Sequence, residues 1–396
     1  MVGRRILNTI LGLSLVLFLA ANSTREVQAS TKTDGAAAEN ERVSAQEQYS
    51  LLDSLDFSDI DEVMDGIFEE DFSFSDLVMS LAGGTAELEK TSVMELLLKT
   101  VASTFQKSKG AMLSILLLGI LSAVFSNISD AFEARGSAQV SFYIISLLLA
   151  GILLRAMREV SQLGSGVLAD LTLFMQTLIP TFIATTAFVS GEGSAAAFYA
   201  SSMLAIWIVE TLLAQIVLPM TELYILLNFV NHLLQEDMLL QLMELLKSAV
   251  LFLLKAVLGI IIGIQTIQGL LAPALHTLKA SAIHRAVSSI PGIGGGINVV
   301  TQTVISSAIV IKNSIGVAGM IFLVLLSISP VLELLAITAM YKITAAMIGI
   351  LSEKKLSACI SNMGEGIKLI MKTVVTAMVL FMISIALLAA FTNRGL

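Results

Sequence analysis

A series of long apolar segments limits what this chain can fold into more than any other feature. The segments cover residues 111–127, 140–158, 167–189, 195–217, 248–271, 314–329, 331–351 and 369–391. A helix of about 20 residues crosses the hydrocarbon core of a bilayer, and most of these segments are close to that length. None shows the alternating pattern, about ten residues long, of a transmembrane strand. We therefore predict an all-α, polytopic helical membrane protein.

Composition supports this class. The chain has 396 residues, of which 56% are hydrophobic and 14% are charged. Soluble globular proteins have roughly 45–50% apolar and about 25% charged residues. A soluble fold is therefore excluded for most of the chain.

The first 29 residues have the pattern of a secretory signal peptide. Arg4 and Arg5 precede the apolar run 6–21, and Val27-Gln28-Ala29 offers small residues for cleavage. This order is typical of a cleaved signal peptide. The alternative is an uncleaved signal anchor, which exposes the same side of the membrane but adds a helix.

Residues 30–110 form an acidic region that we expect to be exported. It contains 17 acidic and 6 basic residues. Residues 30–48 lack aromatic side chains and are predicted to be a disordered linker. Apolar residues then recur at helical spacing up to Leu81, which predicts short amphipathic helices. These helices form either a cap on the membrane domain or a docking surface for a partner. The sequence contains no D-x-D-x-D-G loop, so we do not expect this region to bind calcium.

The remaining residues, 111–396, form the predicted multi-pass membrane domain. Because Lys and Arg in short loops favour the cytoplasm, loop charge predicts orientation. With the acidic region outside, the segments place 128–139, 190–194 and the loop carrying Lys279 and Arg285 inside. They place 159–166, 218–247 and the C-terminus outside.

The sequence contains no motif for catalysis, cofactor binding or a metal. His232, His276 and His284 lack metal-ligand spacing, and the single Cys359 has no partner cysteine. The glycines of "PGIGGGIN" (291–298) are not followed by Lys-Ser/Thr, so they do not form a phosphate-binding P-loop, and they also depart from G-x-G-x-x-G. We predict no enzyme activity and no cofactor.

Polar residues inside apolar segments are the candidate functional residues, because such residues are costly in lipid and usually face protein or water. They are Asp170, Glu210, Lys255, Lys312, Asn313 and Glu333. Glu210 and Lys255 could pair and neutralise each other. Three explanations of these residues stay open: structural pairing or snorkelling to the interface, a substrate or ion pathway, and an incorrect placement of the segment boundaries.

Glycines mark two further candidate regions. Gly259 and Gly263 form a G-x-x-x-G pattern whose helix face is expected to meet another helix, in the same chain or in a second copy. Pro291, Gly292, Gly294, Gly295 and Gly296 open a weakly apolar stretch, 290–312. We expect either a broken, re-entrant helix near a conduit or an interfacial turn followed by a buried helix.

Four sequence stretches together resemble a known family. They are "FMQTLIPTFIATTAF" (174–188), "GIQTIQGLLAPAL" (263–275), "VISSAIVIKNSIGVAGMIFLVLL" (304–326) and "LAITAMYKITAAMIG" (335–349). The most specific piece runs from Lys312 to Gly319 and includes Gly316. The chain resembles the stage III sporulation protein AE family of endospore-forming bacteria over roughly 110–391.

The resemblance implies a location and partners but no catalytic residues. It implies a multi-pass protein made in the mother cell and inserted in the outer forespore membrane. There the chain would be the permease-like core of a channel between mother cell and forespore. The assembly would be completed by a separate cytosolic ATPase, ring-forming membrane proteins and a forespore-side partner. We expect no nucleic-acid partner. The alternative function is a self-sufficient secondary transporter that uses the charged residues named above.

Overall fold

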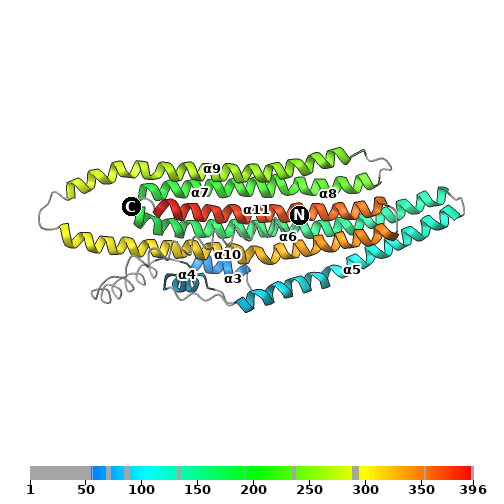
Figure 1. Ribbon diagram of the computed structural model, residues 1–396, viewed down its shortest axis with the longest axis horizontal. Coiled ribbons are helices and arrows are strands. Elements are labelled where there is room, and N and C mark those ends of the chain that lie inside the picture. Colours follow the sequence, from blue (N-terminus) through cyan, green and yellow to red (C-terminus); the bar gives the residue numbers. More distant parts are fainter. Residues whose placement is uncertain are drawn as a thin grey trace.

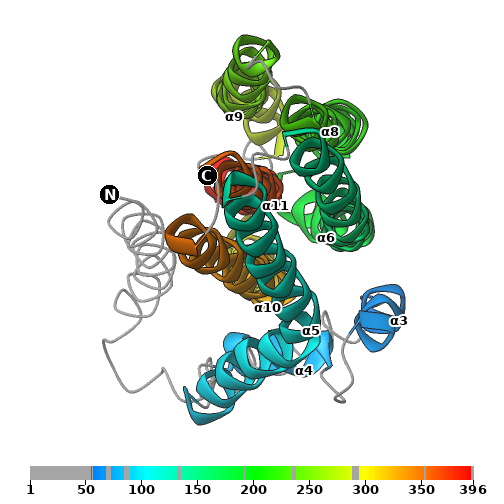
Figure 2. The same ribbon diagram turned by 90° about the vertical axis from the view of Figure 1, so that its right-hand side faces the viewer.

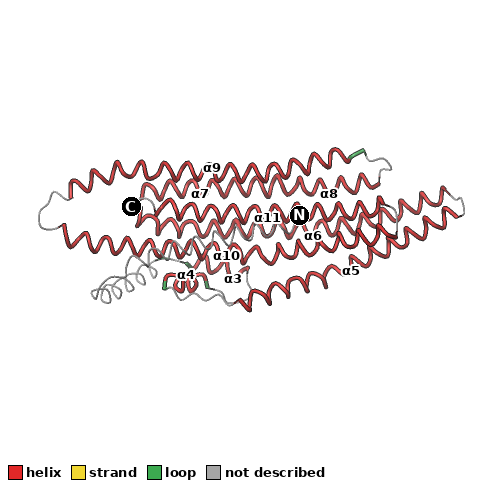
Figure 3. Tube along the Cα trace, viewed as in Figure 1, coloured by secondary structure: helices red, strands yellow, loops and turns green. Residues whose placement is uncertain are grey.

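The computed structural model describes residues 55, 57–67, 73–83, 90–131, 135–190, 192–233, 238–287, 294–351 and 354–393. These residues are almost entirely helical and include no strand (Figure 3). The all-α prediction is therefore confirmed for the described part of the chain, and six of its helices are long and apolar enough to cross a membrane. The predicted signal peptide, 1–29, and the linker, 30–48, lie outside it.

Long helices dominate the fold (Figure 1). In chain order they are α5 (Lys90–Ala131), α6 (Arg135–Ser190), α7 (Glu192–Leu212), α8 (Leu218–Leu233), α9 (Leu240–Val287), α10 (Gly294–Leu351) and α11 (Lys354–Asn393). Helix α6 has 56 residues, which at 1.5 Å per residue makes it about 84 Å long. Since the hydrocarbon core is about 30 Å thick, the longest helices extend well beyond one bilayer.

Several predicted segments are joined into single helices, which corrects the segmentation. Helix α6 runs through 159–166 and past Pro180, and helix α10 runs past Pro330. The stretch 294–312 is the beginning of the continuous helix α10, so the predicted break does not occur after Gly294. Residues 288–293 lie outside the described part. Proline removes one backbone hydrogen bond, but a helix can continue past it when packing holds both sides.

The helix between α7 and α8 is continuous but locally widened. Leu213–Val217 form a π-helical turn, η1, which ends two residues before Pro219. Proline cannot donate a backbone hydrogen bond, and its ring would crowd the carbonyl four residues earlier. The wider π turn provides that space, so α7, η1 and α8 pass through the bundle as one rod.

The continuity of α6 also corrects the predicted orientation of the loops. Residues 128–139 and 190–194 were expected on the same side of the membrane. They adjoin opposite ends of α6, and Figure 1 shows the two ends of this helix at opposite ends of the bundle. The error arose because residues 140–158 and 167–189 are one helix rather than two spans.

Helix α11 lies at the centre of the bundle. It packs against α10, α6, α8 and α9, while α5 packs on α10 and α6 (Figure 2). Its buried side chains are small or apolar along its whole length, which allows contact on several sides.

Two short helices lie on the flank of this bundle. They are α3 (Ser58–Ile67), which packs on α6, and α4 (Phe74–Ala82), which packs on α10. Asp61 accepts a hydrogen bond from the Phe74 backbone N–H at 2.6 Å, and the Ser73 side chain caps α4 by accepting from the Asp76 N–H. These bonds fix the two helices to each other at the point where Phe74 enters the bundle.

Candidate functional site

A cluster of three lysines around one carboxylate joins three helices. Glu365 of α11 binds Lys247 of α9 at 3.1 Å, contacts Lys342 of α10, and lies 3.5 Å from Lys368. Its side chain is 19% exposed. The cluster carries an excess of positive charge, and it fixes the register of α9, α10 and α11.

Other polar contacts lie near the same level. The Ser161 hydroxyl of α6 donates to Glu222 of α8. Close by, Gly366 of α11 packs against Ile225 of α8. We call this level the waist, defined by Ser161, Glu222, Lys247, Lys342 and Glu365.

A second polar network ties α8 to α11 close to the waist. The Asn228 side chain donates to the Cys359 carbonyl at 2.8 Å, and Asn362 donates to Asn228 at 3.1 Å. Both asparagines therefore use their amides within the chain. Among the described residues, no three His, Cys, Asp or Glu side chains lie close enough together to hold a metal ion.

Four charged candidates from the sequence lie beside the waist, all on the same side of it along the bundle. Asp170 follows Ser161 by nine residues, Lys255 follows Lys247 by eight, and Glu333 precedes Lys342 by nine. Glu210 precedes Glu222 by twelve residues, and Lys372 follows Glu365 by seven. At 1.5 Å per residue the five lie about 10–18 Å from the waist.

Beyond these five residues, the same helices lack Asp, Glu, Lys and Arg over lengths that fit a bilayer. The stretches contain 21, 17, 23, 20 and 21 residues, and they are 171–191, 193–209, 256–278, 313–332 and 373–393. All lie within the roughly 17–25 residues of a membrane span. We call this zone the apolar layer. The four candidates therefore mark one edge of the layer rather than its interior.

Close glycine contacts hold the middle of the apolar layer together. A Cβ on Gly319 would lie 2.6 Å from Leu178 of α6, and one on Gly316 would lie 3.3 Å from Phe182. Both glycines belong to the stretch from Lys312 to Gly319 that carries the sequence resemblance described above. Across the layer, Gln265 of α9 donates to Ser384 of α11 at 2.7 Å. The absence of side chains at 316 and 319 thus lets α10 approach α6 and α11 closely.

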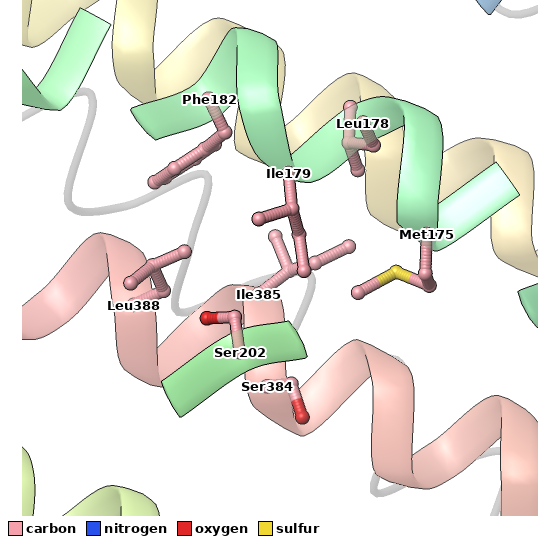
Figure 4. Close-up of a pocket in the computed structure, with 8 residues that line it drawn as sticks. All are labelled: Met175, Leu178, Ile179, Phe182, Ser202, Ser384, Ile385 and Leu388. Atoms are coloured by element: carbon pink, nitrogen blue, oxygen red, sulfur yellow. The ribbon is translucent and has the colours of Figure 1, made fainter. Parts of the chain in front are cut away.

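The apolar layer contains a small cavity between α6, α7 and α11 (Figure 4). It is lined mainly by apolar side chains, with the hydroxyls of Ser202 and Ser384 on one side. It has room for at most about one water molecule. This cavity is therefore a packing defect rather than a substrate chamber.

The charged candidates do not pair with one another. Glu210 and Lys255 are both exposed, and within the described chain they form no ion pair. Lys312 is fully buried in α10, 21 residues from Glu333, so it lies about 31 Å away at the other edge of the layer. Asn313 beside it is half-buried.

The glycine candidates have different surroundings. A Cβ on Gly259 or Gly263 would meet no atom within 4 Å, so this face of α9 is not packed against the described part of its own chain. Pro291 and Gly292 lie outside the described residues. Gly294, Gly295 and Gly296 form the first turn of α10.

The lysine cluster at the waist was missed by the sequence analysis. Lys368 follows Glu365 by three residues, which is a helical-neighbour signal. Lys247 and Lys342 are 118 and 23 residues away in sequence, and no local pattern could have joined them.

A second apolar zone lies on the opposite side of the waist. It consists of 110–129 of α5 and 136–154 of α6, which also lack Asp, Glu, Lys and Arg. Gly119 of α5 contacts Ile348 of α10, and Ser146 of α6 lies 3.3 Å from His232 of α8. We call this zone the distal hairpin.

Comparison with known proteins identifies the family. Residues 72–392 match the family described as Stage III sporulation protein AE. The chain belongs to the stage III sporulation protein AE family. It is 23% identical over 282 residues to Stage III sporulation protein AE of Bacillus subtilis (strain 168), covering 71% of this chain and 70% of the relative. No solved structure matches it. The family resemblance inferred from the sequence is confirmed.

Proposed function

We propose that this chain is a non-enzymatic, integral membrane subunit of a multiprotein channel or secretion complex that links mother cell and forespore. It would lie in the outer forespore membrane with its N-terminal region exported. The observation that carries the proposal is the family match, which extends over 72–392 and so includes every long helix except the last residue of α11.

The architecture of the described chain supports a subunit rather than a complete channel. The helices of the apolar layer interlock through Gly316 and Gly319, and the cavity between α6, α7 and α11 holds about one water at most. A path for larger cargo would therefore need walls from more than one subunit. Energy would come from a separate cytosolic ATPase, and ring-forming and forespore-side membrane proteins would complete the assembly.

The experiment is affinity purification of the tagged, full-length chain from sporulating cells in mild detergent. We expect other sporulation membrane proteins to co-purify stoichiometrically, and deletion of the gene to abolish late forespore gene expression. Recovery of this chain alone under the mildest conditions would contradict the proposal.

A secondary transporter is the alternative, and the charged candidates decide between the two. Asp170, Glu210, Lys255 and Glu333 lie near the same edge of the apolar layer but on separate helices, without an ion pair among them in the described chain. A coupling site would bring such groups together around a shared cavity. Proton or solute flux in liposomes that contain only this protein would support the transporter instead.

A further inference from the structure

The short helices α3 and α4 lie beside the apolar layer rather than beyond its edges. Phe74, fully buried at the start of α4, has its ring centroid 6.3 Å from that of Phe174 and 5.4 Å from that of Phe322. Phe174 lies four residues past Asp170, and Phe322 lies eleven residues before Glu333. Phe74 therefore enters the bundle about 6–16 Å inside the layer.

The outward faces of α3 and α4 are acidic at this depth. The side chains of Asp59, Glu62 and Asp76 are exposed, whereas Ile60 and Phe74 on the inward faces are buried. The sequence has no Lys or Arg between Arg42 and Lys90 that could neutralise these carboxylates locally. An exposed carboxylate within bilayer hydrocarbon costs several kcal/mol, on the order of 2.5–3.5 for Asp on a helix. Lipid cannot cover this flank.

The opposite flank of the layer has the surface that lipid requires. Helices α7 and α9 expose large apolar side chains there: Leu204, Trp207, Ile260 and Ile267. Figure 2 shows α9 on the far side of the bundle from α3 and α4. The apolar layer is thus two-sided, with one apolar flank and one acidic flank at similar depth.

We infer that the flank of α6 and α10 that carries α3 and α4 borders an aqueous path through the membrane, and that other protein subunits complete the wall of this path. The inference rests on the proposed function and specifies which side of the subunit faces the conduit. Helices α3 and α4 place their carboxylates in that water, and Phe74 anchors them to the wall. The acidic lining would repel anions and favour cationic or neutral cargo.

The test compares thiol labelling on the two flanks. In a Cys359→Ser background, which removes the only cysteine, single cysteines are introduced as Asp59→Cys, Glu62→Cys and Asp76→Cys. The matched controls are Leu204→Cys, Ile260→Cys and Ile267→Cys. Membranes from sporulating cells are treated with a charged maleimide or a lipid-soluble one. We expect the charged reagent to label the α3 and α4 positions at least tenfold faster than the α7 and α9 positions.

A photo-crosslink establishes whether the labelled helices are docked at membrane depth. p-Benzoylphenylalanine in place of Phe74 should attach to α6 or α10 near Phe174 and Phe322, mapped by mass spectrometry. A Phe74→Cys, Phe322→Cys pair with a short bifunctional reagent provides the second variant. Charged-reagent labelling together with either crosslink supports the inference. Labelling without any crosslink shows that α3 and α4 lie elsewhere, and crosslinking without labelling shows that lipid or protein covers the flank; each result overturns the inference.

These outcomes are separable from those of the proposed function. If the sporulation partners still co-purify but the α3 and α4 cysteines do not react, the inference fails and the proposed function stands. If those cysteines react and crosslink in cells where the chain is recovered alone, the aqueous flank stands, but the wall made by other subunits and the multiprotein function both fail.

Discussion

The apolar layer and the distal hairpin have similar hydropathy but opposite packing. In the layer, Gly319 is buried against Leu178, and the aromatic rings of Phe174 and Phe322 are in contact. In the distal hairpin, Leu117 is 66% exposed and Leu147 is 61% exposed. An apolar stretch of spanning length can therefore be a packed core or a surface that needs an external partner, and hydropathy alone does not distinguish them.

The two zones also cannot share one bilayer in this arrangement. Gly319 in the layer and Ile348 beside the hairpin belong to the same continuous helix and are 29 residues apart. This separation is about 44 Å, which exceeds the hydrocarbon thickness of about 30 Å. A bilayer centred on the layer leaves the distal hairpin beyond the waist, where protein or other lipid has to cover it.

The largest expected effect comes from an aromatic side chain in the layer. Phe322→Ala removes a buried ring that contacts Phe74 and Phe174, and such truncations cost about 3–5 kcal/mol. Leu117→Ala in the distal hairpin, where the side chain is 66% exposed, should cost less than about 0.5 kcal/mol. Thermal unfolding of both purified variants in the same detergent measures the difference. Equal destabilisation would remove the distinction between packed and unpacked apolar zones.

A smaller effect is expected when a side chain is added instead of removed. Gly319→Leu forces atoms against Leu178 and Ile385 and should destabilise the protein by about 1–3 kcal/mol. Gly151→Leu in the distal hairpin meets no atom within 4 Å and supplies the same gain in helix propensity. We expect this control to be neutral or slightly stabilising by the same measurement. A neutral Gly319→Leu would show that α10 does not approach α6 closely.

Sequence reasoning predicted the helical class and the family but not how the helices are divided. The stretch 159–166 around Gly164 was interpreted as a loop because it lies between two apolar segments. In the structure it lies at the waist, where Gly164 contacts Ile370 and Ser161 bonds Glu222. Pro330 was likewise placed between two segments, although α10 passes through it. Both errors come from treating every apolar stretch as ending at a membrane surface.

The candidate site was predicted only in part, for a related reason. Asp170, Glu210, Lys255 and Glu333 were found because each interrupts or borders an apolar run. Their position at the same edge of the apolar layer depends on the register between helices, which is set by contacts such as Lys247 with Glu365. Such contacts join residues far apart in sequence, so a single sequence carries no local signal for them.

The waist separates the two zones, and its ion cluster should contribute a moderate stabilisation. Glu365→Gln leaves Lys247, Lys342 and Lys368 without their shared carboxylate. Because two of these lysines are more than a third exposed, solvent screening limits the expected loss to about 1 kcal/mol. The control is Glu159→Gln, whose i,i+4 pair with Arg155 is mostly exposed and should not change stability measurably. Unfolding at low and high salt should show a salt-sensitive difference for Glu365→Gln only. A loss as small as that of the control would mean that the waist does not fix the register of α9, α10 and α11.

The smallest effect is expected at the edge of the apolar layer, between Glu210 and Lys255. If they formed a buried ion pair, removing one charge would strand the other, and the double variant would be more stable than the single variants predict. In the structure both side chains are exposed and unpaired with each other, so each can reach water at the edge of the layer. We therefore expect Glu210→Gln, Lys255→Met and the double variant to be additive within about 0.3–0.5 kcal/mol. A double-mutant cycle on unfolding free energy measures this coupling. A coupling of about 1 kcal/mol or more would place the two residues inside the layer instead of at its edge, and would move the boundary between lipid and waist accordingly.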